Sequence, residues 1–283
     1  MVTIEKLLKD GIDIIKQREF NSPKLEVELI LCYLLQKDRI YLHLNRKEEV
    51  SEEIKDKFYK LAEKRNNGYP LQYITNSQEF MGLDFYVQEG VLIPRPDTET
   101  LVETVINIVK ERYNKEIKIL DLGTGSGAIA LSLAYYLRNS FVTAIDISDI
   151  AVETTKINIK KHNLNNIKVI KGNIFEDILG EKFDVLVSNP PYIESDEIKN
   201  LQTEVSVYEP RLALDGGVDG LDYYKPIVEL FKKICEENGV LAVEIGRQQK
   251  KSVEEIFLNS KVFKEVKAYR DLAGNDRVII GMT

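Results

Sequence analysis

The stretch that most limits what this chain can fold into is FDVLVSNPPY, residues 183–192. Its first half is a short, mainly apolar run, which is typical of a strand buried on both faces of a parallel sheet. The run ends at Ser188-Asn189, and the two prolines that follow cannot donate ladder hydrogen bonds and hold the chain extended. A polar side chain, two carbonyl groups and an aromatic ring therefore lie at the carboxyl end of a strand. In open α/β sheets this is the edge where ligands bind.

A glycine-rich turn precedes this stretch in the chain. Residues 117–121 predict a first strand, and Gly-Thr-Gly-Ser-Gly at 123–127 predicts the turn into its helix, with backbone amide groups free to approach a ligand. A further strand, 141–145, ends at Asp146, about 20 residues beyond the glycines, where a carboxylate that binds ribose hydroxyls is expected. Read through Ala128, the loop also fits a nicotinamide-dinucleotide fingerprint. These residues alone do not distinguish between cofactors that contain adenosine.

The loop after the predicted third strand is a candidate for the adenine contact. The strand covers 167–170, and Gly-Asn-Ile-Phe follows at 172–175. In adenosine-binding sheets this loop borders the base, so Asn173 is a candidate hydrogen-bond partner, with Ile174 or Phe175 packed against its face. A plain turn explains the same residues equally well.

The sequence predicts that the chain has three structural parts. Residues 1–70 carry apolar stripes at helical spacing, with helix starts at Ser22-Pro23 and Ser51, and predict a small helical bundle. Residues 71–93 predict a β-hairpin linker whose strands are 71–74 and 83–87. Residues 94–283 predict the α/β domain.

The fold class expected for the α/β domain is a Rossmann-like sheet of seven strands, mostly parallel, in which strands and helices alternate. The last two strands, 262–269 and 277–282, predict an antiparallel pair at the edge. Helices are expected over 194–207 and over 221–237.

Composition narrows the function classes. The net charge of −7 argues mildly against a nucleic-acid substrate, because such proteins usually carry a basic face. No apolar run approaches the ~20 residues of a membrane span, and the amino terminus lacks the pattern of a signal peptide. The 2 cysteines and 2 histidines form no cluster with zinc-ligand spacing. We therefore expect a reducing, cytoplasmic setting with free thiols, no metal and no membrane partner.

Asn-Pro-Pro-Tyr directly after a buried strand resembles the catalytic motif of methyltransferases that act on a planar nitrogen with S-adenosylmethionine, releasing S-adenosylhomocysteine. An amide or amino nitrogen is a weak nucleophile because its lone pair is delocalised, so positioning supplies much of the rate. Asn189 Oδ1 and the Pro190 carbonyl can each accept one N–H, and the Tyr192 ring can attract a cationic sulfonium. The motif argues against a dinucleotide-dependent oxidoreductase. It is shared with adenine-N6 DNA and guanine-N2 RNA methyltransferases, which remain the alternative function.

Six motifs in order make a more specific resemblance: IPRPDTE at 93–99, DLGTGSGAIAL at 121–131, SNPPY at 188–192, YEPRLAL at 208–214, DGL at 219–221 and EIG at 244–246. Together they resemble the peptide chain release factor glutamine methyltransferases, the PrmC/HemK family, over nearly the whole chain. The resemblance implies methylation of the side-chain nitrogen (N5) of the glutamine in the Gly-Gly-Gln motif of release factors, in translation termination. It also implies a protein partner. We further expect no direct nucleic acid, a monomeric enzyme, and a docking role for residues 1–70, because the glutamine must arrive on a large protein.

The resemblance assigns the site residues as well. It implies that the cofactor is bound by Gly123, Thr124, Gly125, Ser126, Gly127, Asp146, Asn173, Ile174 and Asn189. It implies that the glutamine is bound by Asn189, Pro190, Pro191 and Tyr192, with Asn189, Pro190 and Tyr192 catalytic. Related enzymes more often carry an acidic residue at the Asn173 position. Arg95, Asp97 and Glu99 are expected to border the site without an assigned role.

Overall fold

The computed structural model describes residues 2–16, 21–173, 175 and 180–283. The chain divides into two compact units. The helical unit comprises Met1–Ser77 and Gln202–Tyr208, and the methyltransferase unit, so called below, comprises Gln78–Leu201 and Glu209–Thr283. Each unit therefore contains two separate stretches of the chain.

The helical unit is a small bundle with one short antiparallel strand pair. Its elements are β1 (Val2–Thr3), α1 (Ile4–Ile14), α2 (Pro23–Leu35), α3 (Arg39–Leu44), β2 (Glu49–Val50), α4 (Glu52–Asn66), α5 (Leu71–Thr75) and α9 (Thr203–Ser206). Two predicted helix starts are confirmed: Pro23 is the first residue of α2, and Ser51 Oγ accepts the Ile54 N–H at 3.3 Å at the start of α4. Gly11 lets α1 pack closely against α4, because a Cβ at this position would lie 2.7 Å from the Phe58 ring of α4.

The strand predicted at 71–74 is wrong. Those residues form the single helical turn α5, which ends at Asn76 in the left-handed conformation (φ 52°). Tyr73 and Ile74 are both buried although they are adjacent, which suits a helix and not the alternation of a strand. The hairpin forms later, between β3 (Gln78–Phe80) and β4 (Leu83–Phe85), because its two connecting residues both have positive φ, as in a type I′ turn.

The methyltransferase unit is built on a sheet of 7 strands in the order β10-β11-β9-β8-β5-β6-β7. The strands are β5 (Ile117–Leu122), β6 (Ser140–Asp146), β7 (Ile167–Lys171), β8 (Phe183–Ser188), β9 (Cys235–Glu244), β10 (Glu265–Arg270) and β11 (Asp276–Met282). All pairings from β7 to β9 are parallel, and β11 pairs antiparallel with both β9 and β10. The predicted fold class, a mostly parallel sheet with an antiparallel edge, is confirmed.

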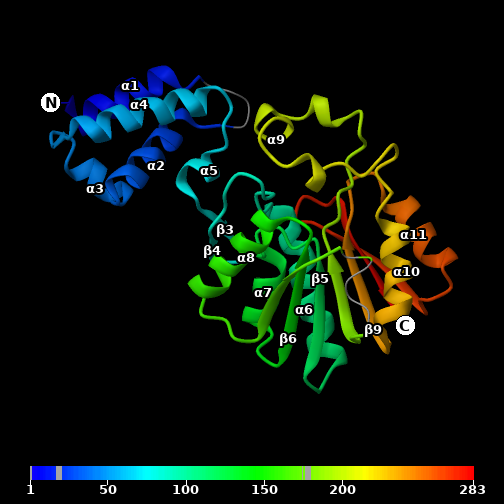
Figure 1. The fold of residues 1–283 in the computed structure, drawn as a ribbon. Coiled ribbons are helices and arrows are strands. Elements are labelled where there is room, and N and C mark those ends of the chain that lie inside the picture. The colour runs from blue at the N-terminus through cyan, green and yellow to red at the C-terminus, as the bar shows by residue number, and fades with distance from the viewer. Residues whose placement is uncertain (1, 17–20, 174, 176–179) are drawn as a thin grey trace. The chain divides into compact units, whose positions relative to one another are not determined.

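Helices cover both faces of this sheet (Figure 1). One face carries α6 (Glu99–Arg112), α7 (Ala128–Tyr136) and α8 (Asp149–Lys161), and the other carries α10 (Tyr224–Ile234) and α11 (Lys250–Asn259). Successive strand residues alternate between the two cores: Ile119 and Val185 pack with α6 and α7, whereas Leu120 and Leu186 pack with α10. Burial on both faces explains why these strands are apolar throughout.

Two predicted helices differ in the structure. The helix expected over 194–207 is replaced by a 3₁₀ turn, Ile198–Asn200, and the single turn α9. The helix expected to reach residue 237 ends at Ile234, because the chain enters β9 at Cys235. Both cysteines are free and half-buried. Among the described residues, no helix is long and apolar enough to cross a membrane.

The strand order fixes where a ligand can bind. From β5 the chain runs outward on one side through β6 and β7, then returns to the other side of β5 as β8. Such a reversal opens a crevice at the carboxyl ends of the two central strands. The glycine loop follows β5 and the SNPPY motif begins at the end of β8, so both predicted motifs lie at this edge.

Candidate active site

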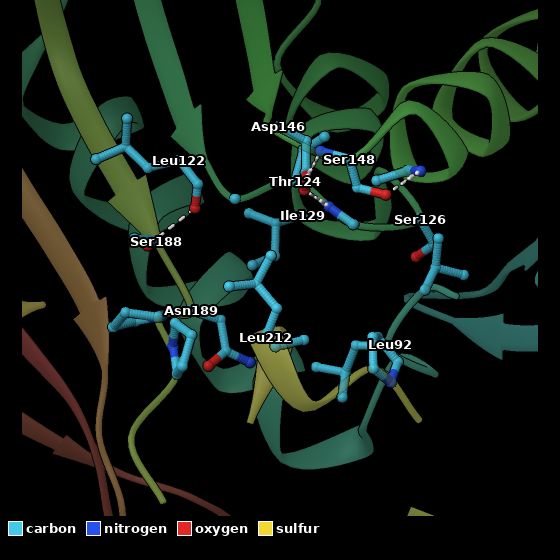
Figure 2. Close-up of a pocket in the computed structure, with 18 of the residues that line it drawn as sticks. Leu92, Leu122, Thr124, Ser126, Ile129, Asp146, Ser148, Ser188, Asn189 and Leu212 are labelled. Carbon is cyan, nitrogen blue, oxygen red and sulfur yellow. Dashed lines mark hydrogen bonds between the residues drawn. The ribbon is translucent and has the colours of Figure 1, made fainter. Parts of the chain in front are cut away.

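A cavity of about 410 Å³ opens at the carboxyl ends of β5, β6 and β8, within the methyltransferase unit (Figure 2). It brings together many of the predicted site residues: Gly123, Thr124, Gly125, Ser126, Asp146, Asn173, Asn189, Pro190 and Pro191. Its walls also include residues that the sequence did not single out: Phe80, Gly90, Val91, Leu92, Pro94, Thr98, Ile129, Ser148 and Tyr223. In Figure 2, Asp146 and Thr124 lie on one side of the cavity, and Asn189 and Leu212 on the opposite side.

The first two glycines of the loop leave open space beside the backbone. Gly123 and Gly125 have φ values of 72° and 57°, and a Cβ built on either would meet no described atom within 4 Å. Gly127 differs, because a Cβ there would lie 2.5 Å from Leu131 Cδ1. Gly127 is not among the cavity-lining residues and instead packs the turn against α7. The open faces of Gly123 and Gly125 allow a ligand to approach the main chain closely.

Asp146 organises the loop as well as facing the cavity. Its Oδ2 accepts the Gly125 N–H and its Oδ1 accepts the Ser148 N–H, each at 2.9 Å (Figure 2). Each carboxylate oxygen has a second lone pair, so the group can accept further hydrogen bonds from a ligand.

A second carboxylate, Asp121, lies fully buried beneath the same loop. Thr124 Oγ1 donates to its Oδ2 at 2.7 Å, and its Oδ1 has no hydrogen-bond partner among the described residues. Burial raises the pKa of Asp121 to about 7, and the nearby Asp146 charge adds to the increase. This residue supports the loop from inside and was not predicted from the sequence.

Asn173 forms a local turn at the cavity wall. Its Oδ1 accepts the Phe175 N–H at 3.0 Å, which makes a local turn, and both residues line the cavity. Ile174 lies outside the described residues.

The SNPPY motif is held by its neighbours in the sheet. Ser188 is in register with Leu122, and its Oγ donates to the Leu122 carbonyl at 2.9 Å (Figure 2). Asn189 Nδ2 donates to Thr98 Oγ1 at 3.3 Å, while its Oδ1 accepts no hydrogen bond from the described residues. Tyr192 is not among the lining residues; its hydroxyl donates to Glu244 Oε1 at 3.1 Å.

The IPRPDTE motif is explained by contacts within the methyltransferase unit. Arg95 Nη2 lies 2.7 Å from both carboxylate oxygens of Glu209, which joins this motif to YEPRLAL. Asp97 pairs with Arg277 at 2.9 Å, and Glu99 Oε1 accepts the Met81 N–H at 2.6 Å.

Thr98 is the motif residue that reaches Asn189, and it was missed. Its position between Asp97 and Glu99 in the IPRPDTE motif was the sequence feature that could have indicated its role. Among the described residues, no group of three or more histidine, cysteine, aspartate or glutamate side chains is arranged to hold a metal ion.

Comparison with known proteins identifies the family. Residues 6–75 match the family described as PrmC N-terminal domain, and residues 96–217 match the methyltransferase small domain. Release factor glutamine methyltransferases from Clostridium botulinum and Clostridium acetobutylicum are 42% and 40% identical to this chain. The alignments cover 98% and 99% of this chain and 98% of each relative. A methyltransferase structure from Pyrococcus furiosus has a TM-score of 0.50 at 21% identity, over 71% of this chain and 89% of that one, and shows a likeness of fold alone.

The two family matches fall on the amino-terminal helices and on the region that contains both the glycine loop and SNPPY. The similarity to the clostridial proteins extends over nearly the full length of both chains. This chain therefore belongs to the release factor glutamine methyltransferase family.

Proposed function

We propose that this protein methylates the side-chain nitrogen (N5) of the glutamine in the Gly-Gly-Gln motif of peptide chain release factors, with S-adenosylmethionine as the methyl donor. The observation that carries the proposal is the hydrogen bonding of the Asn189 side-chain amide. Its nitrogen is engaged by Thr98, so its oxygen is left to accept an N–H of a substrate at the cavity wall. The relatives that match over nearly their full length are named for this reaction.

The cavity suits S-adenosylmethionine in several ways. Its volume of about 410 Å³ falls in the range of small-molecule sites. The open faces of Gly123 and Gly125 would let the ligand contact the main chain, and Asp146 would accept the ribose hydroxyls. Asn173 and Phe175 would border the adenine. S-adenosylmethionine supplies an electrophilic methyl group on a positively charged sulfur.

The residues of this chain act mainly by positioning. Asn189 Oδ1 accepts one N–H of the glutamine amide, and the Pro190 carbonyl accepts the other. Neither proline has an N–H that would compete. The two acceptors hold the nitrogen in one orientation and stabilise the positive charge that develops on it as it becomes methylated. When the methyl–sulfur bond breaks, S-adenosylhomocysteine would leave, and the cationic N-methyl amide is acidic enough to give its surplus proton to water, so no strong base is required.

Tyr192 has a supporting role, outside the cavity wall. Its side chain does not line the cavity, and its hydroxyl is hydrogen-bonded to Glu244. We assign to it the fixing of the preceding Pro190-Pro191 segment, which does line the cavity.

The partner that we propose is a release factor, with no direct contact to nucleic acid. The net charge of −7 fits a protein substrate better than a polyanion. Because release factors act in translation, we place the reaction in the cytoplasm. We expect the enzyme to act as a monomer.

The helical unit is the proposed docking surface for the release factor. Its helix α3 exposes two apolar side chains one turn apart, Ile40 (68% exposed) and Leu44 (79%). The substrate glutamine arrives on a large protein, and an exposed apolar pair of this kind can contribute to its binding.

The assay that tests the function is transfer of labelled methyl from S-adenosylmethionine to purified release factor, beside DNA and RNA. We expect label on the release factor alone, and none on a release factor whose Gly-Gly-Gln glutamine is replaced by alanine. Label on DNA or RNA instead would support the alternative function. Calorimetry with S-adenosylhomocysteine and NAD tests the cofactor, and binding of NAD alone would overturn it.

A further inference from the structure

Glu244 is a buried carboxylate to which the proposed reaction assigns no task. It is the last residue of β9, opposite Val278 of β11 and one residue beyond Val243, which is in register with Ser188 of β8. The residue is 1% exposed. Its Oε1 accepts the Tyr192 hydroxyl, and its Oε2 has no hydrogen-bond partner among the described residues. Oε2 therefore retains acceptor capacity.

Charged and polar groups surround this carboxylate on several sides. Burial raises the pKa of Glu244 to about 7; the Thr98 hydroxyl and the Arg277 charge lower it, and Asp97 raises it. Asp271 in turn pairs with Arg277 at 3.2 Å. The Tyr224 hydroxyl, from α10, donates to the main-chain carbonyl of Glu244 at 3.0 Å. With Arg277 beside it, the carboxylate can ionise near neutral pH.

Thr98 connects Glu244 to the cavity wall. A hydroxyl has one hydrogen to donate and two lone pairs to accept. Thr98 Oγ1 uses a lone pair to accept from Asn189 Nδ2, so its own hydrogen must go elsewhere. Thr98 is one of the groups that interact with the Glu244 carboxylate, whose Oε2 has no hydrogen-bond partner among the described residues and, when the group is ionised, carries no hydrogen of its own.

We propose that Glu244 is a positioning residue: its carboxylate takes the Thr98 hydrogen, Thr98 then accepts from Asn189 Nδ2, and Asn189 Oδ1 is thereby directed to the substrate nitrogen. The two ends of an amide have nearly the same shape, so the hydrogen-bond partner decides which end points where. The ionised carboxylate can only accept, and in that form it sets the direction of every bond in this chain. The final step rests on the proposed function, whereas the chain of hydrogen bonds does not.

The substitution Glu244→Gln separates charge from shape. The neutral amide has nearly the same size but can donate to Thr98, which frees the Thr98 hydrogen to turn toward Asn189 Oδ1. The substrate acceptor would then be occupied. We expect kcat for release factor methylation to fall roughly tenfold to a hundredfold, as for other losses of positioning. The KM for release factor and the affinity for S-adenosylhomocysteine should change less than about threefold, since neither is bound by Glu244.

A double-mutant cycle tests the path through Thr98. Thr98→Val should reproduce the loss in kcat, and Thr98→Ser, which keeps the hydroxyl, should restore most of it. Adding Glu244→Gln to Thr98→Val should cost nothing further, because the connection is already broken. If the two losses multiply while Tyr192→Phe matches Glu244→Gln, then Glu244 acts through Tyr192 and the Thr98 path is wrong. Thermal melting checks that each variant is folded, and Thr98→Ser and Thr98→Val carry the test if Glu244→Gln is not.

A measurement on the free enzyme separates this proposal from the proposed function. With ¹⁵N-labelled asparagine, the Asn189 side-chain NH₂ signal is identified by its loss in Asn189→Ala. We expect its exchange with water to be slow in the wild type and at least about tenfold faster in Thr98→Val and in Glu244→Gln. Equal exchange rates in all three would overturn the hydrogen-bond chain, whether or not release factor is methylated. Absence of methyl transfer by the wild type would overturn only the function.

Discussion

Asn189 must meet two hydrogen-bonding requirements with one amide group. Its nitrogen donates to Thr98 at 3.3 Å, and in the proposed reaction its oxygen accepts from the substrate. An aspartate in its place has two acceptors and no donor, so the bond to Thr98 must be rebuilt with the opposite polarity. This distinction allows proton removal and positioning to be told apart.

We predict that Asn189→Asp lowers turnover at saturating cofactor by about tenfold or more, and that Asn189→Ala is as slow or slower. An enzyme that needed a general base at this position would tolerate or prefer the carboxylate. Initial rates with release factor, with folding checked by melting temperature, measure the ranking. An aspartate variant as fast as the wild type would show that acceptor capacity alone is sufficient.

We predict that Asp146 increases the affinity for the cofactor in two ways, by binding ribose and by ordering the glycine loop. It would lose hydrogen bonds to ribose, and its carboxylate also orders the loop through the Gly125 and Ser148 amides. Hydrogen bonds to charged groups contribute ~1.5–3 kcal/mol, so Asp146→Ala should weaken S-adenosylhomocysteine binding roughly tenfold or more. Calorimetry gives the dissociation constant. Unchanged affinity would remove Asp146 from the ribose site.

At the scale of elements, one buried ion pair ties α4 to the short turn α9. Arg65 is 3% exposed and contacts Glu26 of α2 at 2.7 Å and Glu204 of α9 at 2.8 Å. Tyr208 extends the same attachment, with its ring 5.1 Å from that of Tyr69. These contacts join the segment 202–208 to the rest of the helical unit.

Removing Arg65 should destabilise the helical unit more than removing its α9 partner. Arg65→Met leaves Glu26 buried without its cation, a change that typically costs ~3–5 kcal/mol. Glu204→Gln keeps the Arg65–Glu26 pair and should cost less than about 1 kcal/mol. Thermal melting gives the ranking, and limited proteolysis should cut Arg65→Met first near residues 202–208. Equal melting of Arg65→Met and wild type would contradict this account.

The elements also show which features were predictable from sequence. Strands buried on both faces, such as β5 and β8, are apolar throughout, and the motifs that end them predicted the edge where the cavity lies. Local patterns of four residues were less reliable. The alternation of Leu71-Gln72-Tyr73-Ile74 favours a strand only weakly, and in the structure these residues belong to the helical turn α5.

Long-range contacts within the site were not predictable from any one segment. The partnership of Thr98 with Asn189 joins residues 91 positions apart, and that of Arg95 with Glu209 joins residues 114 apart. Asp121 and Glu244 each lie at or next to the end of a strand, and their positions in the sequence do not by themselves indicate burial. Their burial became evident only when the neighbouring elements were in place.

At the scale of the whole molecule, Asp121 and Glu244 give stability an unusual dependence on pH. Burial raises both pKa values to about 7, so the folded protein holds these protons where the unfolded chain has lost them. Their contribution to stability is therefore fully present below about pH 4 and is lost as the pH rises toward 7. Carboxylates with lowered pKa values, such as Asp215, lose their contribution in more acidic solution.

We predict that the free energy of unfolding falls between pH 5 and 7, by up to about 1.4 kcal/mol per pH unit for each of the two groups. Asp121→Asn keeps an acceptor for Thr124 and should remove one of these two slopes. Denaturation of the ligand-free protein at several pH values compares it with the wild type. Parallel pH dependences of the two proteins would show that Asp121 titrates normally.

Docking through the helical unit is tested at its surface. Ile40→Ser with Leu44→Ser should raise the KM for release factor severalfold and leave S-adenosylhomocysteine binding unchanged, because the cavity lies in the methyltransferase unit. Leu258→Ser is a matched control, since Leu258 is also a helical leucine that is 61% exposed, but on α11. If the control and the double variant have the same KM as the wild type, α3 does not contact the release factor.

Because residues 202–208 belong to the helical unit, the two units cannot be separated by dividing the chain at one position. The chain crosses from one unit to the other at residues 77–78, 201–202 and 208–209. Removal of residues 1–77 would leave Glu204 without Arg65 and Tyr208 without Tyr69. Both residues lie a few positions before Pro210 and Leu212, which line the cavity. A chimaera between relatives must therefore exchange the amino-terminal helices and this inserted segment as one module. Recombination at a single junction between residues 78 and 201 would take Arg65 and Glu204 from different relatives.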